Sequence, residues 1–149
     1  MNITGNSFVP FDFVHVEEVI RLDREYFYRP WNTGQWVDLD WNIHFLALWG
    51  TPDKLKGFGL FSIVPGDEAA HLLKLLVRPE LQGSGEAKQF FDQTCGVLKD
   101  KGIGRIFLEV EKSNTRAIKF YEKAGFKLLR LIKNFYSDGG DALTMDVVL

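Results

Sequence analysis

Two glycines interrupt the stretch Leu76-Val77-Arg78-Pro79-Glu80-Leu81-Gln82-Gly83-Ser84-Gly85-Glu86-Ala87, which leads from an apolar strand into an amphipathic helix. A strand, turn and helix in this order point free backbone N–H groups outward at the positive end of the helix dipole, where phosphate oxygens bind. Two common phosphate loops are excluded, because the chain has no Gly-Lys-Ser/Thr triplet here and Lys88 stands where the dinucleotide-binding loop needs a third Gly or Ala. Taken alone, the stretch predicts either another kind of phosphate-binding loop or an ordinary turn before a helix.

Strands and helices alternate on both sides of this turn. Residues 72–77 form a nearly continuous apolar run, which is typical of a central strand covered on both faces. Apolar residues at helical spacing predict a helix over 85–101, and Asn114 and Gly125 suit the two ends of another helix. The other expected elements are a strand at 8–13, a helix at 16–27 capped by Asp12, a short helix at 32–41, strands at 43–49, 58–64 and 106–110, a turn at 65–67, and a closing hairpin of 126–136 with 142–149. This order predicts an α/β domain with a mixed sheet and helices on both faces.

Length and composition limit the class of protein. The chain has 149 residues, which corresponds to one domain, and its 18 basic and 20 acidic residues give a net charge of −2, which argues against a nucleic-acid-binding surface. Cys95 is the single cysteine, so an intramolecular disulfide and a multi-cysteine metal cluster are excluded, and His15, His44 and His71 lack metal-ligand spacing. The first six residues do not resemble a signal peptide, and no apolar run approaches the roughly 18 residues of a membrane span. We therefore expect one cytoplasmic domain over residues 1–149 without nucleic-acid, membrane or metal partners.

Two motifs in the second half of the chain carry a family resemblance. Gln82-Gly83-Ser84-Gly85-Glu86-Ala87 fits the Gln/Arg-x-x-Gly-x-Gly/Ala motif of the GNAT superfamily of acyl-CoA N-acyltransferases. About 30 residues later, Asn114-Thr115-Arg116-Ala117-Ile118-Lys119-Phe120-Tyr121-Glu122-Lys123-Ala124-Gly125-Phe126 resembles the second signature of that superfamily, Asn-x-x-Ala-x-x-x-Tyr-x-x-x-Gly-Phe. The resemblance covers residues 70–149 well and residues 1–70 loosely. It implies a GNAT-like fold, in which a mixed, mostly antiparallel central sheet has helices on both faces.

Shorter segments resemble one branch of this superfamily, the ribosomal-protein alanine N-acetyltransferases. Leu108-Glu109-Val110-Glu111-Lys112-Ser113-Asn114 resembles their Leu-Glu-Val-x-x-Ser-Asn segment. Tyr28-Arg29-Pro30-Trp31-Asn32 resembles their Pro-Trp-Ser/Thr turn, and Asp141-Ala142-Leu143-Thr144-Met145 is also similar. The resemblance implies transfer of an acetyl group from acetyl-CoA to a primary amine by direct attack, without a covalent enzyme intermediate.

The same resemblance assigns residues to the cosubstrate acetyl-CoA. Leu76 and Val77 would pair their backbone with the pantetheine arm as if it were an extra strand, and the N–H of Val77 would face the thioester carbonyl as an oxyanion donor. Asn114 would lie beside the cosubstrate while it caps its own helix. The residues expected to hold the pyrophosphate through backbone N–H groups are Gln82, Gly83, Ser84, Gly85, Glu86, Ala87 and Lys88.

Two side chains are candidates for proton transfer. Glu109 interrupts an apolar strand near its carboxyl end, where open α/β sheets place ligands, and is the candidate general base. The alternatives are that Glu109 faces solvent or pairs with a lysine, and Glu111 on the same strand face is a second candidate base. Tyr121 is the candidate general acid for the leaving thiolate, and the alternative is a core aromatic on an amphipathic helix. Trp31 and Tyr136 are expected to line the substrate cleft from opposite sides.

Two departures from the family pattern keep other functions open. Glu86 stands where the loop is usually apolar, so its carboxylate would repel a pyrophosphate unless it points away or pairs with Lys88. Ser84 stands where a basic residue is common. A CoA-binding regulatory domain without catalysis, and an assembly domain without a cofactor, are therefore alternatives. For an enzyme, the acceptor is expected to be a protein N-terminus or a small-molecule amine, and the chain a monomer or a homodimer.

Overall fold

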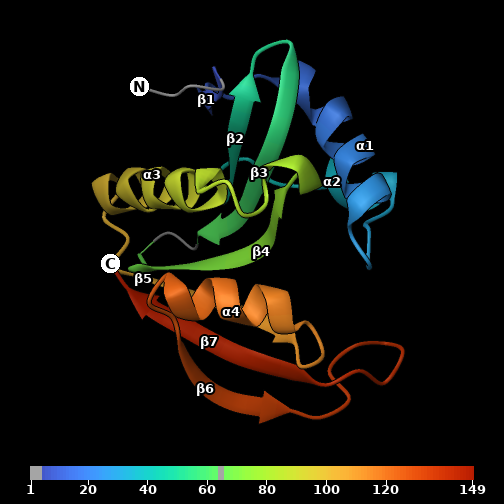
Figure 1. Cartoon of the computed structure of the whole chain (residues 1–149), viewed down its shortest axis with the longest axis vertical. Coiled ribbons are helices and arrows are strands. Elements are labelled where there is room, and N and C mark those ends of the chain that lie inside the picture. Colours follow the sequence, from blue (N-terminus) through green and yellow to red (C-terminus); the bar gives the residue numbers. More distant parts are fainter. Residues whose placement is uncertain (1–4, 64–65) are drawn as a thin grey trace.

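Seven strands form one sheet in the computed structural model, which describes residues 5–63 and 66–149. Its order is β1-β2-β3-β4-β5-β7-β6, and every neighbouring pair is antiparallel except β4 and β5, which are parallel (Figure 1). The predicted mixed, mostly antiparallel sheet is thus confirmed. The strands are β1 (Ser7–Val9), β2 (His44–Thr51), β3 (Lys54–Ile63), β4 (Ala69–Val77), β5 (Arg105–Glu111), β6 (Lys127–Ile132) and β7 (Ala142–Val148).

Helices cover both faces of the sheet, as predicted. On one face, α1 (Val16–Tyr26) and α2 (Thr33–Val37) place Val19 and Trp36 against Leu48 and Phe58 of the sheet. On the other face lie α3 (Glu86–Asp100) and α4 (Thr115–Lys123), and Phe91 of α3 is one of the buried residues there. Short 3-10 helices precede α1 (Phe13–His15) and α3 (Pro79–Leu81). Alternate residues of each strand therefore contribute to two separate apolar layers.

A bulge in β4 changes which residues face each layer. Leu60 of β3 pairs with Lys74, whereas Phe61 pairs with Leu72, so Leu73 is an extra residue in β4. Before the bulge Leu72 packs on the α3 and α4 side, and after it Leu76 packs on the α1 and α2 side. The prediction of a central strand over 72–77, covered on both faces, was wrong in two respects. The strand begins earlier, at Ala69, and its burial alternates along the chain.

The sheet divides between β4 and β5. Their parallel pairing covers Ala69 to His71 of β4 with Arg105 to Phe107 of β5. Among the described residues no strand partner is recorded on that edge for 72–77, although β3 pairs with β4 as far as Val77 on the other edge. Figure 1 shows the two halves of the sheet diverging on the side where α1 ends and the loop between β6 and β7 projects. The last residues of β4 therefore offer one edge for pairing with another extended segment.

Several predicted boundaries were also wrong, each for a local reason. β1 ends before Pro10, which has no N–H for a strand ladder, and Asp12 instead caps the 3-10 helix that precedes α1. α2 is shorter than predicted because Asp40 turns the chain, accepting the N–H of Asn42 through its side chain. β6 ends at Ile132, and residues 133–141 form a loop. The predicted turn at 65–67 and the end of the strand predicted over 58–64 include residues 64–65, which lie outside the described residues.

Candidate active site

The glycine loop ends β4 and starts α3. Gly83 and Gly85 have φ values of +80° and +87°, in the left-handed region that favours glycine. Gly85 is the N-cap residue of α3, and Ser84 Oγ accepts the N–H of Glu86 at 3.3 Å. The N–H groups of Ala87 and Lys88 follow in the first helical turn, where no intrahelical acceptor exists. This arrangement fits an anion held by backbone N–H groups and the helix dipole.

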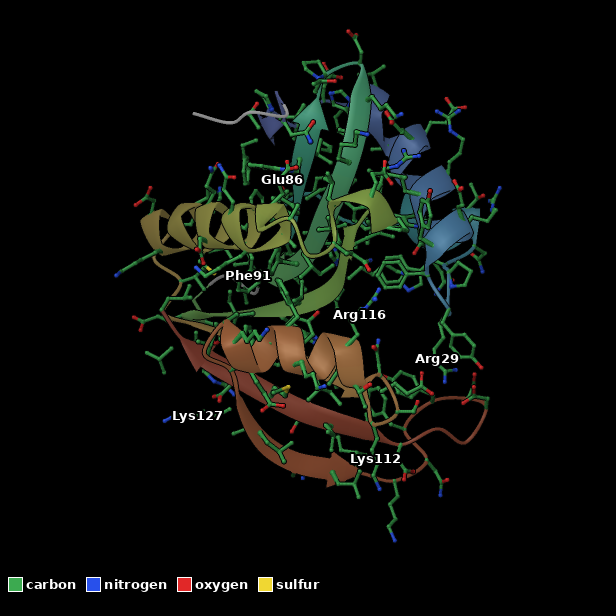
Figure 2. All side chains as sticks on the ribbon, in the orientation of Figure 1. Arg29, Glu86, Phe91, Lys112, Arg116 and Lys127 are labelled. Atoms are coloured by element: carbon green, nitrogen blue, oxygen red, sulfur yellow. The ribbon has the colours of Figure 1, made fainter. Side chains whose placement is uncertain are left out.

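Glu86 points away from this loop into the protein. Its side chain accepts hydrogen bonds from Asn6 Nδ2 at 3.0 Å and from Trp49 Nε1 at 3.2 Å, and Figure 2 shows it at the start of α3 beside β2. Lys88 pairs with Asp92 rather than with Glu86. Burial of the carboxylate on the inner side of α3 removes the conflict with a pyrophosphate. The feature that supported a non-catalytic domain therefore gives it no support.

Gln82 joins the loop to its neighbours. Its Oε1 accepts from Arg116 Nη1, and its Nε2 donates to the carbonyl of Val77 at 3.4 Å. Arg116 lies on α4, whose N-terminus is capped by Asn114 through the N–H of Ala117 at 3.1 Å. The end of β4, the glycine loop and the start of α4 are therefore next to one another, as the resemblance implied (Figure 2).

Glu109 is paired with His71, a histidine for which the sequence predicts no role. His71 Nε2 lies 3.0 Å from both carboxylate oxygens of Glu109, and the His71 ring stacks on Phe107 with centroids 4.5 Å apart. The alternative of a lysine partner is thus wrong. The register explains the contact, because His71 pairs with Phe107 and alternate residues of β5 share a face. Knowledge of the β4–β5 pairing would have revealed it.

Glu111 is held by an arginine from the other side of the site. Arg29 Nη2 lies 3.0 Å from Glu111 Oε1, Arg29 Nη1 lies 2.8 Å from Asp138 Oδ2, and the guanidinium lies 4.2 Å from the ring centroid of Tyr136. The hydrogen bonds to Asp138 and Glu111 raise the pKa of Arg29, and the bond from Arg29 lowers the pKa of Asp138. Figure 2 shows Arg29 reaching from the end of α1 toward the β6–β7 loop. Glu111 is thus engaged in an ion pair, which favours Glu109 as the base.

Two tyrosines share this electrostatic environment. Burial is the main cause that raises the pKa of Tyr136, the charges of Glu111 and Glu109 raise it further, and Arg29 opposes them. Burial also raises the pKa of Tyr121, with a smaller contribution from Tyr136. Tyr121 packs edge-on against Phe126 with ring centroids 5.3 Å apart. Its hydroxyl is therefore protonated at neutral pH and can serve only as a donor to a developing negative charge.

A buried ion pair that the sequence did not predict fixes the segment before α2. Lys74 Nζ lies 2.7 Å from Asp23 Oδ1, with side chains 4% and 0% exposed. Asp23 Oδ2 accepts from Trp31 N at 2.8 Å and from Trp36 Nε1 at 3.1 Å, while Lys74 also donates to the carbonyl of Arg29 at 3.3 Å. Burial lowers the pKa of Lys74, and Asp23 opposes this effect. Trp31, a predicted cleft residue, is thus anchored through its backbone close to Arg29, which stacks on Tyr136.

Within residues 5–63 and 66–149, no group of three or more His, Cys, Asp or Glu side chains could hold a metal ion. In the same residues, no helix has the length and apolar character needed to cross a membrane.

Comparisons with known proteins agree with this geometry. The profile of the Acetyltransferase (GNAT) family matches residues 16–126. The chain is 31% identical over 107 residues to the [ribosomal protein bS18]-alanine N-acetyltransferase of Haemophilus ducreyi, covering 72% of each protein. Its fold matches the ribosomal-protein-S18-alanine N-acetyltransferase from Escherichia coli with a TM-score of 0.85 at 22% identity, covering 96% of this chain and 93% of that one.

A plant structure shows the same fold. Arabidopsis thaliana Naa50, in complex with the bisubstrate analogue CoA-Ac-MVNAL, matches with a TM-score of 0.82 at 19% identity, covering 97% of this chain and 99% of that one. The family profile spans well over half of the chain, and it includes the glycine loop, Glu109 and Tyr121. The chain therefore belongs to the GNAT acetyltransferase family and is an acetyl-CoA-dependent N-acetyltransferase.

Proposed function

We propose that this enzyme acetylates the α-amine of a protein N-terminus, with Glu109 as the general base and Tyr121 as the general acid. The observation that carries the proposal is the divergence of β4 from β5, which, within residues 5–63 and 66–149, leaves one edge of β4 without a strand partner beside the base. Cosubstrate residues lie on the α3 and α4 side of this opening. The ion pairs of Arg29 lie on the α1 and α2 side.

On the cosubstrate side, the backbone does most of the binding. The N–H groups of Gln82, Ser84 and Glu86 already donate within the loop, so those of Gly83, Gly85, Ala87 and Lys88 hold the pyrophosphate. Leu76 and Val77 pair with the pantetheine arm along the free edge of β4. The N–H of Val77 donates to the thioester carbonyl oxygen, where negative charge develops during attack. Asn114 lies beside the cosubstrate at the start of α4. Donors already fixed by the fold need little reorganisation when that charge appears.

On the acceptor side, Glu109 removes a proton from the substrate ammonium, directly or through one water molecule. The freed amine forms the new N–C bond, the C–S bond breaks, and Tyr121 gives its proton to the leaving thiolate. The nitrogen loses its second proton to water as the amide forms, and the phenolate of Tyr121 takes a proton back from water. A protein N-terminus has a pKa of about 8, so a carboxylate can deprotonate it near neutral pH. Burial keeps the phenol of Tyr121 a weak acid, so it donates only once the thiolate carries charge.

A protein N-terminus is favoured as the acceptor by the shape of the acceptor side. Arg29 joins the segment after α1 to the β6–β7 loop through Asp138, and so it closes the site between Trp31 and Tyr136. An acceptor side bounded by two separate segments suits an extended peptide end that enters amine first. The relatives from Haemophilus ducreyi and Escherichia coli are named as alanine N-acetyltransferases of a ribosomal protein, which supports a protein acceptor.

The test is an acceptor screen with acetyl-CoA and the full chain. The acceptors are a short peptide with a free N-terminal alanine, the same peptide blocked at its N-terminus but containing lysine, and spermidine. We expect transfer to the free N-terminus alone, and a loss of kcat of about a hundredfold in Glu109→Gln and in Tyr121→Phe with unchanged affinity for acetyl-CoA. Transfer to spermidine without transfer to either peptide would replace the N-terminal acceptor by a small-molecule amine.

A further inference from the structure

His71 is the only protein group recorded as a hydrogen-bond partner of the Glu109 carboxylate within the described residues. The two side chains are partly buried, with 28% and 21% of their surfaces exposed, and the imidazole Nε2 lies 3.0 Å from each carboxylate oxygen. An ionised carboxylate only accepts hydrogen bonds, so Nε2 carries the proton in this contact. The N–H therefore bisects the carboxylate in a three-centre hydrogen bond.

We propose that His71 is a positioning residue for Glu109, holding the carboxylate in one orientation toward the acceptor amine. This inference rests on the proposed role of Glu109 as the base. A carboxylate on a β-strand has several staggered rotamers, and a hydrogen bond to a fixed donor selects one of them.

The imidazole is itself held in place. Its ring stacks on Phe107 with an interplanar angle of 12°, and its backbone pairs with Ser62 on one side and Phe107 on the other. His71 is the last β4 residue that pairs with β5 before the two strands diverge. A rigid donor at this point can fix a carboxylate that projects into the opening.

Charged groups near His71 and Glu109 form ion pairs with other residues. Arg105 pairs with Asp146 at 2.8 Å on the far side of Phe107. Glu111 pairs with Arg29, and Tyr136 lies close enough for the charge of Glu109 to raise its pKa. Among the described residues, His71 is therefore the positively polarised donor available to Glu109.

The test compares His71→Leu, which keeps bulk but removes the donor, with His71→Gln, which keeps an N–H donor. Transfer from acetyl-CoA to the alanine peptide is measured for both variants and the parent. For His71→Leu we expect kcat to fall about tenfold, and for His71→Gln we expect it to stay within about threefold of the parent. The KM for acetyl-CoA stays unchanged in both, because His71 lies at the opposite end of β4 from the glycine loop.

A spectroscopic measurement needs no activity. Long-range proton–nitrogen NMR spectra show which imidazole nitrogen of His71 carries the proton, and we expect Nε2–H in the parent and a mixture of tautomers in Glu109→Ala. Full kcat in His71→Leu, equal losses in the Leu and Gln variants, or an unchanged tautomer in Glu109→Ala would each overturn the role of His71. A parent that acetylates none of the amines would overturn the proposed function, and the role of His71 with it.

Discussion

Replacement of Asp23 by Asn tests how strongly the buried ion pair holds the acceptor side of the site. Asp23 accepts from Lys74, Trp31 and Trp36, and the ammonium of Lys74 is almost completely buried. Removing one partner of such a pair costs about 3–5 kcal/mol of stability, because the other charge stays buried without compensation. Asn retains an acceptor for the two tryptophan N–H groups, so we expect about 3 kcal/mol. For a domain of this size that corresponds to a fall in Tm of about 6–12 °C.

The loss should depend on pH with a definite sign. The folded pKa of Lys74 lies below its ordinary value of 10.5, so between the two values the unfolded chain binds more protons and stability rises with pH. Asp23 opposes this lowering of the pKa of Lys74. In Asp23→Asn the pH range in which stability rises with pH therefore extends to lower pH. The difference between the parent and Asp23→Asn should therefore shrink as pH rises toward 10.5. Tyr121 and Tyr136, with raised pKa values, act in the opposite direction above about pH 10, but equally in both chains.

Urea denaturation at neutral pH and at about pH 9.5 measures both effects. Glu25→Gln on the exposed side of α1 is the matched control, because it removes a carboxylate charge without touching the pair. The double variant Asp23→Asn with Lys74→Met should recover most of the stability, since it leaves no buried charge and keeps an acceptor for the N–H groups of Trp31 and Trp36. A loss below about 1 kcal/mol, or one equal to that of Glu25→Gln, would refute the reasoning.

Three further outcomes are expected. Gly85 has φ at +87°, so Gly85→Ala should lose about 1 kcal/mol of stability and should bind acetyl-CoA more weakly, as measured by calorimetry. The control Gly96→Ala, inside α3, should be neutral or stabilising. Equal effects of the two variants would exclude backbone strain as the cause. Arg29→Gln should raise the KM for the alanine peptide but not for acetyl-CoA, and an unchanged peptide KM would remove Arg29 from the acceptor side. Burial raises the pKa of Cys95 to about 11, so its alkylation should be slow at neutral pH and should accelerate on unfolding in urea. Rapid alkylation of the folded chain at neutral pH would contradict that burial.

Elements whose ends carry their own signals were predicted well from the sequence. The expected helix over 85–101 corresponds to α3, and Gly102 after it has φ at +87°. Asn114 caps α4 and Gly125 ends it, as predicted. Capping is a contact between residues three or four positions apart, so the information lies within one short stretch of chain.

No residue in the sequence marks the bulge in β4 in the way that capping residues mark helix ends. The extra residue, Leu73, is a leucine like Leu72 before it, so the hydropathy pattern of 72–77 does not show that the strand changes face. The run also contains Lys74, and burial of that lysine depends on Asp23, which comes from α1. Local hydropathy could not reveal a charge that is neutralised from elsewhere in the chain.

In the candidate site, too, features within one short stretch of sequence were predicted and contacts between distant residues were missed. Residues within the two motifs, such as Gly85 and Tyr121, were expected from the sequence and remain proposals for cosubstrate binding and proton transfer. The missed contacts join residues far apart in the sequence: 38 positions separate His71 from Glu109, 51 separate Asp23 from Lys74, and 82 separate Arg29 from Glu111. Pairs at such distances follow from strand order and register, which a single sequence does not contain.

A short part of β4 connects these contacts. His71 is the last residue paired with β5 and contacts Glu109, Leu73 forms the bulge, and Lys74 holds the segment that contains Arg29. Separation of two strands exposes backbone groups, which is unfavourable unless other interactions fix the separated halves. The ion pair of Lys74 with Asp23 and the ion pairs of Arg29 with Glu111 and Asp138 supply such interactions on the acceptor side. The divergence of β4 from β5 is thus part of the folded chain. Under the proposed function, acetyl-CoA therefore meets a preformed edge, and the proposed positioning of Glu109 by His71 depends on the same strand.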